Sequence, residues 1–434
     1  MTAPTHTPRN DDEIYDLIGI GFGPSNLSLA IAIEEAGLPI RVKFLEARPA
    51  FAWHPGMMIP GADMQISFLK DLVSQRNPQS RYSFLNYLHK KGRMNAFINR
   101  KTFFPSRVEF NDYLGWVAGQ FDCCDYDRNV CGIEPLGNAG AGGTVQTLCV
   151  TARNSAGAEH VYHARNLVIA PGGASMLPPV CDGLRGDDRL FHSKDYMSRV
   201  VPALKAGDRI AVVGAGQSAA EIFADLAQRA EAPQVDLILR GSAMKPSDDS
   251  PFVNEIFAPE QTDRFHEMSE SLRRGLLDEL SGTNYAVVDE DLICAIYTML
   301  YEQSVSGAGR LRLRSQTQVV GMSSEDAKLR VELRGRKACD TKLYDKVVFA
   351  TGYSRKLDAS VLHGLAPLCE DTETRRDYRL SMKPGFRPAV FVQGYSESSH
   401  GLSDTLLSVL AQRSAEIVAA LGTLVNEAQA IAAE

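Results

Sequence analysis

The segment from Gly19 to Asn26 has the residue types of a turn that binds a nucleotide. Gly19 and Gly21 occupy the first two positions of a dinucleotide-binding turn, where glycine makes a tight turn and lets a pyrophosphate approach backbone N–H groups. Pro24 stands at the third position, which is normally a small residue, and departs from the pattern. Glu46 ends the next apolar segment, where a carboxylate can bind a ribose hydroxyl. These residues predict a first dinucleotide site.

A second turn of the same kind lies in the middle of the chain. Gly214 and Gly216 fill its first two positions, and Ala219 is small enough for the third. The next apolar segment ends in Arg240 and not in an acid. A guanidinium forms charge-assisted hydrogen bonds with a 2′-phosphate, so this arginine favours NADPH over NADH unless it is an ordinary surface residue.

Two such turns in this order predict that FAD binds at the first and a nicotinamide cofactor at the second. A disulfide as electron acceptor would need a cysteine pair beside the flavin, and the eight cysteines include no CxxC pair. They also lack the paired spacing with histidine that is typical of a zinc site, so no metal site is predicted. The remaining expectation is free thiols, with oxygen as the electron acceptor.

The composition of the 434-residue chain is that of a globular protein, with 44% hydrophobic and 23% charged residues. The 46 Lys and Arg against 53 Asp and Glu give a net charge of −7, which provides no long-range attraction to nucleic acid. We find no secretory signal and no apolar run of about 18 residues, so neither export nor a membrane span is expected. These features predict a cytoplasmic enzyme that acts on small molecules.

Apolar strands alternate with helices around both turns, which predicts parallel sheets with ligands at the carboxyl ends of the strands. Further strands are predicted at residues 41–45, 167–170, 235–239 and 346–350. The predicted fold class is α/β, with two Rossmann-like dinucleotide-binding domains, for FAD and NADPH, and a small helical substrate-binding insertion. The FAD domain is predicted to comprise residues 1–206 and 350–434, the NADPH domain 207–250 and 310–349, and the insertion 251–309.

Local patterns predict three further features. Residues 281–302 have helical spacing within the insertion. Residues 402–420 predict an amphipathic helix after Gly401, with the last dozen residues of the chain frayed. The Gly/Ala stretch 138–144 predicts a loop between two strands.

Several motifs far apart in the chain resemble those of the microbial N-hydroxylating flavin monooxygenases, most closely the L-ornithine N5-monooxygenases. They are residues 64–72 (MQISFLKDL), 82–88 (YSFLNYL), 249–257 (DSPFVNEIF), 283–285 (TNY), 348–353 (VFATGY) and 400–408 (HGLSDTLLS). The resemblance implies that FAD and NADPH are bound and that a C4a-hydroperoxyflavin hydroxylates the side-chain amine of L-ornithine with O₂. It further implies a role in hydroxamate siderophore biosynthesis for iron acquisition, and a homotetramer.

The resemblance also implies roles for individual residues, none of them a catalytic nucleophile. The expected flavin contacts, together with Arg107 as a further cofactor contact, are Gly19, Gly21, Gly23, Pro24, Ser25, Asn26, Glu46, Trp53, His54, Gln65, Thr405, Leu406 and Leu407. The expected NADPH contacts are Ala215, Gly216, Gln217, Ser218, Arg240, Asn284, Tyr285 and Ala286. The expected substrate contacts are Lys70, Asn254, Glu255, Ile256, Phe257, Asn284 and Ser408.

Other interpretations of these residues stay open at the level of sequence. Lys70 can be a solvated lysine, Asn254 and Asn284 can be helix caps or turn formers, and Ser408 can bond its own helix backbone. L-lysine is an alternative substrate, because one methylene is worth only about 1–3 kcal/mol in a pocket. Putrescine and cadaverine are weaker alternatives, since they lack the carboxylate that Lys70 would neutralise. A flavin reductase that passes electrons to a protein, and an inactive binding protein, are alternatives of other classes.

Overall fold

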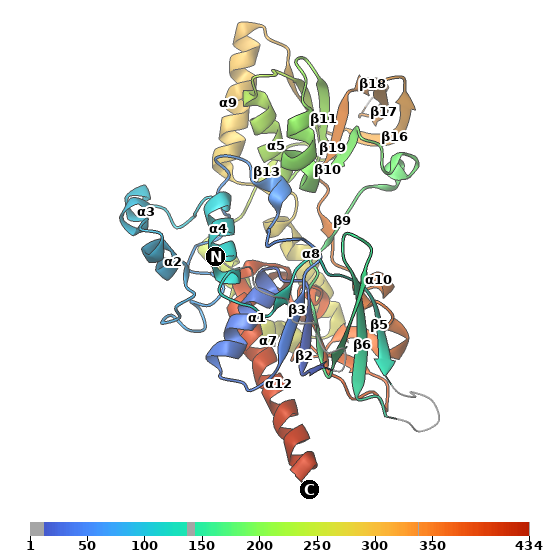
Figure 1. Ribbon diagram of the computed structural model, residues 1–434. Helices are drawn as coiled ribbons and strands as arrows, with labels where there is room; N and C mark the ends of the chain where they lie inside the picture. Colours follow the sequence, from blue (N-terminus) through green and yellow to red (C-terminus); the bar gives the residue numbers. More distant parts are fainter. Residues whose placement is uncertain (1–12, 137–143, 337, 434) are drawn as a thin grey trace, which may run out of the picture.

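The computed structural model describes residues 13–136, 144–336 and 338–433, so the predicted loop 138–144 lies outside the described residues except for its last one. Figure 1 shows two α/β units, one above the other. In the part of the chain that the structure describes, no helix is long and apolar enough to cross a membrane.

The lower unit in Figure 1 is built on a five-stranded sheet with the order β23-β8-β2-β3-β4, in which every pairing is parallel. Its strands are β2 (Leu17–Ile20), β3 (Val42–Leu45), β4 (Cys124–Asp125), β8 (Leu167–Ile169) and β23 (Val390–Val392). The strands β2, β8 and β23 are wholly buried, as continuous apolar runs in parallel sheets usually are. Segments from both ends of the chain therefore complete one sheet.

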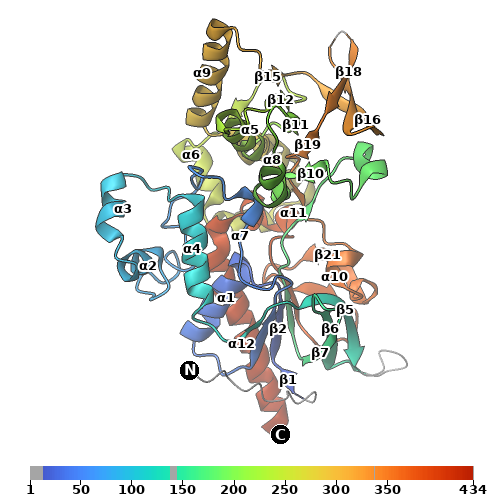
Figure 2. The ribbon, with the colours of Figure 1, turned by 45° about the horizontal axis from the view of Figure 1, so that its top comes forward.

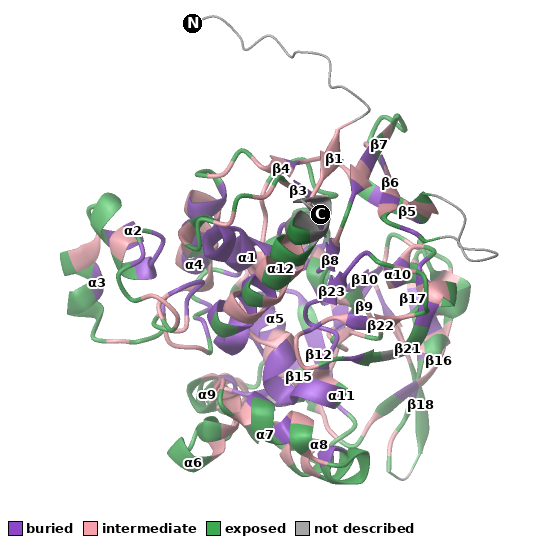
Figure 3. Ribbon diagram, turned by 90° about the horizontal axis from the view of Figure 1, so that it is seen from below, coloured by how far each residue is buried: buried purple, intermediate pink, exposed green. Residues whose placement is uncertain are grey.

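Helices cover this first sheet and two smaller sheets flank it. Helix α1 (Pro24–Glu35) packs against α12 (Leu410–Ala433), and α4 (Arg107–Ala118) belongs to the same buried cluster, with α2 (Phe84–Lys90) and α3 (Met94–Arg100) beside it. Figure 3 shows α1 as largely buried. The flanking strands are β1 (Ile14–Tyr15), β5 (Asn129–Leu136), β6 (Thr147–Arg153), β7 (Glu159–Ala164), β21 (Cys369–Thr374) and β22 (Leu380–Met382).

The upper unit is built on a second five-stranded parallel sheet with the order β10-β19-β11-β12-β15. Its strands are β10 (Leu190–His192), β11 (Arg209–Val213), β12 (Gln234–Ile238), β15 (Leu311–Arg314) and β19 (Lys346–Phe349). Because β10 pairs with β19, residues 190–192 lie in this sheet although they precede residue 207, the predicted start of the second domain. The predicted division into domains itself stays a prediction.

The second sheet is covered on both faces. Helices α5 (Gln217–Gln228) and α9 (Glu290–Ser306) pack in one apolar cluster. An antiparallel sheet of β16 (Gln318–Glu325), β17 (Lys328–Arg334) and β18 (Cys339–Tyr344) contributes to another. Figure 2 shows α5 and α9 on the opposite side of the strands from β16 and β18.

The predicted helical insertion, residues 251–309, contains α6 (Pro251–Asn254), α7 (Gln261–Glu267), α8 (Glu270–Asn284) and all of α9, although α9 packs with α5 of the second unit. The stretch 281–302, which has helical spacing, is helical at both ends but interrupted in the structure, because the chain leaves α8 and forms β14 (Val287–Val288), which pairs with β13 (Lys245–Pro246). Ala286 has a φ of +58°, a left-handed conformation that interrupts a right-handed helix.

The predicted C-terminal helix starts later than expected and extends further. Two short 3-10 turns, Leu402–Thr405 and Leu407–Val409, precede α12, which continues past residue 420 to Ala433, into the last dozen residues that were predicted to be frayed. The remaining short elements are β9 (Ala174–Ser175), β20 (Tyr353–Ser354), α10 (Ala359–Leu362) and α11 (Glu397–His400). All eight cysteines are free thiols.

Candidate active site

A cavity of about 2570 Å³ is lined by residues of both α/β units. Its walls include the turn between β11 and α5, the end of β12, and segments of the first unit before and after β23. This location agrees with the rule that open parallel sheets bind ligands beyond the carboxyl ends of their strands. The predicted site residues that line it are Trp53, His54, Gln65, Lys70, Arg107, Ala215, Gly216, Gln217, Ser218, Arg240, Asn254, Phe257, Tyr285, Ala286, Thr405, Leu406, Leu407 and Ser408.

Other predicted site residues do not belong to this lining. Gly19, Gly21, Gly23, Pro24, Ser25, Asn26 and Glu46 form the corner where β2 and β3 end and α1 begins. Glu255 and Ile256 lie in a short 3-10 turn next to the cavity residue Phe257. Asn284 ends α8, and its side chain lies outside the described part of the structure.

The first glycine turn excludes a side chain at Gly21, where another part of the backbone approaches closely. Gly21 has a φ of +82°, and a Cβ there would lie 2.6 Å from the carbonyl oxygen of Ala170. A Cβ at Gly23 would meet nothing within 4 Å. Helix α1 then begins without a capping side chain, so its first N–H groups remain available to an anion. This turn fits the pyrophosphate of a dinucleotide.

The structure explains why proline occupies the third position of this turn. Pro24 is the first residue of α1, where the missing N–H would have no partner in the helix and where the fixed φ suits helical geometry. The departure from the glycine pattern therefore leaves the turn intact.

Asn26 and Glu46 hold the turn in shape. The buried Asn26 amide donates to the carbonyl oxygens of Ile20 (3.2 Å) and Gly21 (2.7 Å). The Glu46 carboxylate accepts hydrogen bonds from the backbone N–H groups of Phe22 (2.8 Å) and Arg48 (3.0 Å). In the structure, the Asn26 and Glu46 side chains therefore make these hydrogen bonds with backbone groups of the turn and its neighbours.

The second turn has the same properties. A Cβ at Gly214 would lie 2.5 Å from the carbonyl oxygen of Ala350, and Ala219 is fully buried behind it. Helix α5 begins after Gly216 without a capping side chain. Arg240, which directly follows the last buried residue of that strand region, is exposed in the cavity wall. The helix N-terminus and this guanidinium fit a dinucleotide with a 2′-phosphate.

Lys70, Asn254 and Ser408 line the cavity, and the first two also line a neighbouring hollow of about 440 Å³. Partial burial lowers the pKa of Lys70. The Asn254 amide nitrogen donates to the carbonyl oxygen of Asp249 at 2.7 Å, which leaves its amide oxygen as an acceptor. Ser408 is 2% exposed, and its hydroxyl has no hydrogen-bond partner. An unpartnered buried hydroxyl in a cavity wall fits a polar ligand group.

His54 carries no charge at neutral pH. Burial, followed by the nearby Arg107, Arg355 and Arg48 guanidinium groups, lowers its pKa to about 4. The ring packs edge-on against Trp53 and Tyr353, with ring centroids 5.1 and 5.8 Å away. The surrounding positive charge favours an anionic ligand beside this neutral ring.

Arg107 reaches the cavity but also bridges the two units. Its two terminal nitrogens donate to the Glu221 carboxylate at 2.7 and 2.8 Å. No role was predicted for Glu221, nor for Asp289, which accepts hydrogen bonds from Gln65 at 3.0 Å and Gln217 at 2.9 Å. The available signal was a carboxylate at 221 within an otherwise apolar stretch of α5.

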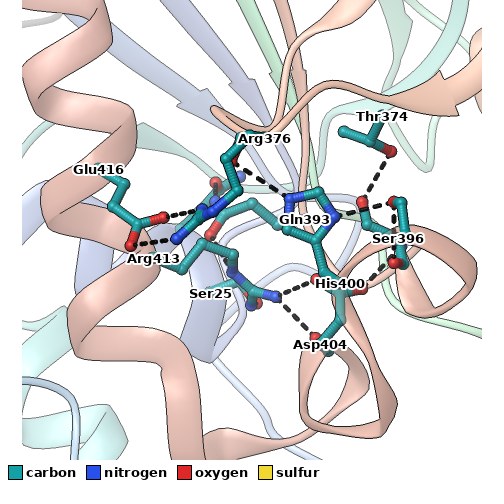
Figure 4. A network of polar contacts seen from close by, with 11 residues as sticks. Ser25, Thr374, Arg376, Gln393, Ser396, His400, Asp404, Arg413 and Glu416 are labelled. Carbon is teal, nitrogen blue, oxygen red and sulfur yellow. Dashed lines mark hydrogen bonds and ion pairs between the residues drawn. The ribbon is translucent and has the colours of Figure 1, made fainter. Parts of the chain in front are cut away.

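A buried arginine was also missed. Arg413 of α12 is 1% exposed and donates to the Asp404 carboxylate at 2.9 Å, to Gln393 at 3.1 Å and to the Ser25 hydroxyl at 3.0 Å. Figure 4 shows these contacts converging on its guanidinium. Gln393 in turn donates to Asn26 at 2.9 Å. Arg413 thus joins the first glycine turn to the segment that ends in the cavity.

Residues 13–355 match the family model described as L-lysine 6-monooxygenase/L-ornithine 5-monooxygenase. An L-ornithine N(5)-monooxygenase from Pseudomonas aeruginosa is 46% identical over 417 residues, 94% of each chain. The solved ornithine hydroxylase from Pseudomonas aeruginosa superimposes with a TM-score of 0.91 at 45% identity, over 95% of this chain and 100% of that one.

A second solved structure, titled as an ornithine N-hydroxylase from Kutzneria sp. 744 with reduced FAD, NADP⁺ and L-ornithine, has a TM-score of 0.88 at 37% identity. It covers 94% of this chain and 99% of that chain. The predicted α/β fold class and the predicted family resemblance are confirmed. The chain belongs to the family of the L-lysine 6-monooxygenases and L-ornithine 5-monooxygenases.

Proposed function

We propose that the protein is an FAD- and NADPH-dependent monooxygenase that hydroxylates the N5 amine of L-ornithine and supplies hydroxamate siderophore biosynthesis. The observation that carries the proposal is one cavity lined by the second glycine turn, by Trp53, His54 and Gln65, and by the polar group Lys70, Asn254 and Ser408. The names of the 46% identical relative and of the Kutzneria structure support it.

FAD would be held by the turn from Gly19 to Asn26 together with Glu46, Trp53, His54, Gln65 and the segment from Thr405 to Leu407. NADPH would be held by the α5 N-terminus, Arg240 and the segment from Asn284 to Ala286. When bound, the two cofactors supply reducing equivalents and activate O₂, so no protein nucleophile is needed. The chain itself must bind, orient and exclude water.

The proton state of the substrate amine is the main task left to the chain. An amine of this type has a reference pKa near that of lysine, about 10.4, so roughly one molecule in a few thousand is neutral and nucleophilic at pH 7. Burial in the cavity favours the neutral form, because desolvation penalises a charge. The same effect is visible in the lowered pKa of Lys70.

The other end of the amino acid needs a fixed position. Lys70 neutralises the α-carboxylate, the free amide oxygen of Asn254 accepts from the α-ammonium, and Ser408 supplies its unpartnered hydroxyl. Fixing this end sets the place of the side-chain amine, and catalysis is then largely orientation.

L-lysine is the second candidate substrate, since the family description names both amino acids. Purified holoenzyme should be incubated separately with ornithine, lysine, putrescine and cadaverine, and hydroxylated product measured beside NADPH consumption. We expect product with ornithine and much less with the other three amines. Hydroxylated product with lysine alone would make L-lysine the substrate in place of L-ornithine. NADPH consumption without any hydroxylated product would refute the monooxygenase assignment.

We also propose a homotetramer located in the cytoplasm. Light scattering during size-exclusion chromatography of the purified protein tests the first statement, and fractionation of the producing cells tests the second. A mass of one or two chains would overturn the tetramer.

A further inference from the structure

A closed set of polar contacts crosses between the two α/β units at the cavity. Arg107 lies at the start of α4 in the first unit, and Glu221 lies in α5 of the second. Their side chains are 13% and 5% exposed and make two parallel hydrogen bonds of 2.7 and 2.8 Å. Arg107 also donates to the carbonyl oxygen of Met57 at 3.0 Å. Such bidentate pairs fix orientation as well as distance.

The contacts continue from Glu221 back to the first unit. The Gln217 amide donates to Glu221 at 3.1 Å and to Asp289 at 2.9 Å, and accepts from the Asp289 backbone N–H at 2.9 Å. Asp289 then accepts from Gln65 of the first unit at 3.0 Å. Two separate routes therefore connect α5 to the first unit, and both pass beside its N-terminal turn.

Apolar packing shields the Arg107–Glu221 pair. Met57, Ile59 and Ala62 come from the first unit but are buried in the cluster that surrounds α5. The backbone N–H of Arg107 donates to the Ala62 carbonyl oxygen at 2.8 Å, which fixes the start of α4 to the same segment. Exclusion of water strengthens a charge pair, and it raises the cost of leaving either partner alone.

We propose that Glu221 is a positioning residue for flavin reduction: through Arg107 it holds α5, and with it the second nucleotide turn, in register with the first unit. The inference rests on the proposed function, since it requires FAD and NADPH in the two turns. Glu221 lies about one helical turn beyond Gln217, the first residue of α5, so a shift of the helix at this pair also moves the N-terminus that would hold the pyrophosphate. Small displacements of this kind are costly because reaction rates depend steeply on alignment.

The test compares Glu221→Gln with Asp208→Asn in FAD-loaded protein. Asp208 forms a similarly buried pair with Lys346 at 2.6 Å, but both partners lie within the second unit. Anaerobic mixing without amino acid measures hydride transfer from NADPH to the flavin, which leaves NADP⁺ and reduced flavin. We expect E221Q to lower the limiting rate about tenfold or more and D208N to leave it within about twofold of wild type.

Hydrogen exchange of the same FAD-loaded proteins, without NADPH, gives a readout independent of activity. We expect E221Q to speed exchange in α4 and in residues 55–62, which face α5, and D208N not to do so. An unchanged rate in E221Q, an equal loss in D208N, or a slow E221Q with unchanged exchange would each overturn the proposal. In the last case Glu221 would act on the cofactor directly.

A second variant covers the case in which E221Q does not fold. Glu221→Asp keeps the charge and shortens the side chain by one methylene, and it is judged by the same rate and exchange criteria. Because the reduction measurement needs no amino acid, failure of ornithine hydroxylation would refute the proposed function without deciding the role of Glu221. A protein that binds no flavin would refute both.

Discussion

Ser408 has a buried polar group that the protein itself does not satisfy. Its side chain is almost fully buried, yet its hydroxyl has no partner, and leaving such a group unsatisfied is costly. Ser414, six residues further along, is also buried but bonds the Ser28 hydroxyl at 3.0 Å. One of these two buried serines therefore has a hydroxyl free for a ligand, whereas the other uses its hydroxyl within the protein. Substituting each of them separates an effect on substrate binding from an effect on stability.

We expect Ser408→Ala to leave the free energy of unfolding nearly unchanged and to raise KM for ornithine roughly tenfold, because the hydroxyl bonds the substrate and not the protein. Ser414→Ala should do the reverse, with a loss of about 1 kcal/mol of stability and no change in KM. Urea unfolding and steady-state kinetics measure the two effects. A stability loss in S408A equal to that in S414A would contradict the assignment.

Lys70→Ala should raise KM for ornithine by about 10- to 100-fold, the effect of losing one charge-assisted contact to a carboxylate. NADPH oxidation should persist, with hydrogen peroxide released in place of hydroxylated product. The exposed Lys90, at the end of α2, provides the control, and K90A should behave as wild type. An unchanged KM in K70A would remove Lys70 from the substrate site.

Arg240→Ala should raise KM for NADPH by about 10- to 100-fold and leave KM for NADH nearly unchanged, because only NADPH carries the 2′-phosphate. Arg240→Lys keeps the charge but loses the guanidinium fork, so its KM for NADPH should lie between those of the wild type and R240A. Flavin reduction measured with both nucleotides decides the matter. Equal losses with both would refute the 2′-phosphate role.

At the scale of elements, α12 is attached to the first glycine turn by one buried side chain. Arg413 bonds Asp404, Gln393 and Ser25, and the pair with Asp404 is sealed from solvent, with 1% and 0% of the side chains exposed. The 3-10 turns from Leu402 to Val409 bend the chain so that Asp404 faces this guanidinium. The cavity residues Thr405 to Ser408 therefore depend on a contact outside the cavity.

Arg413→Met should lower the free energy of unfolding by about 3–5 kcal/mol and reduce flavin content, because it leaves the Asp404 carboxylate buried without a partner. Combining it with Asp404→Asn should recover part of the loss. Arg165→Met removes an exposed pair with Asp16 and should cost less than about 1 kcal/mol. Urea unfolding and flavin absorbance provide the measurements, and additive losses in the double variant would contradict the coupling.

The ring of His400, the last residue of α11, packs on Tyr378 and should make stability pH-dependent. Burial lowers its pKa from 6.5 to about 4, against the opposing effect of Asp404. Between these values the unfolded chain takes up a proton that the folded chain does not, so stability falls as pH drops from 6.5 towards 4, by up to roughly 3 kcal/mol.

The His400 ring makes hydrogen bonds with the Ser399 hydroxyl and with the carbonyl oxygen of Arg376. His400→Gln can keep both of these hydrogen bonds without titrating, so it isolates this contribution. The difference in unfolding free energy between wild type and H400Q should shrink as pH falls through this range. Guanidinium unfolding at pH 7, 6, 5 and 4.5 measures it, and parallel curves for the two proteins would contradict the assignment to His400.

The sequence predicted elements well where the signal was local. Both glycine turns lie within a few residues of their strand and helix, and all four strands predicted from apolar runs exist with ends shifted by one residue at most. The break between α8 and α9 was missed, because it depends on the pairing of β14 with the distant β13. The roles of Glu221 and Arg413 were missed for the same reason, since Arg107 lies 114 residues from Glu221 and Ser25 lies 388 residues from Arg413.

For the whole molecule, the predicted α/β fold class is confirmed, and the two parallel sheets of the structure belong to units that meet at the cavity. The first turn and Glu46 do not line that cavity, but Ser25 of the turn is joined through Arg413 to Asp404, which directly precedes the cavity residue Thr405. Sequence patterns cannot reveal this arrangement, because the relative placement of two units depends on their contact surface and not on local propensity. Measurements on variants of the Arg107–Glu221 pair therefore test the relative placement of the two units, which is the feature that the sequence predicts least well.

The shared first sheet also has a consequence for synthesis of the protein. Strand β23 and helix α12 leave the ribosome after every other strand has been made, whereas the second sheet is complete once residue 349 has emerged. Domains generally fold as units while the chain is being made. The second sheet can therefore form while the chain is still being made, whereas the first sheet cannot be completed before β23 has been made, so we expect flavin to bind only after that point.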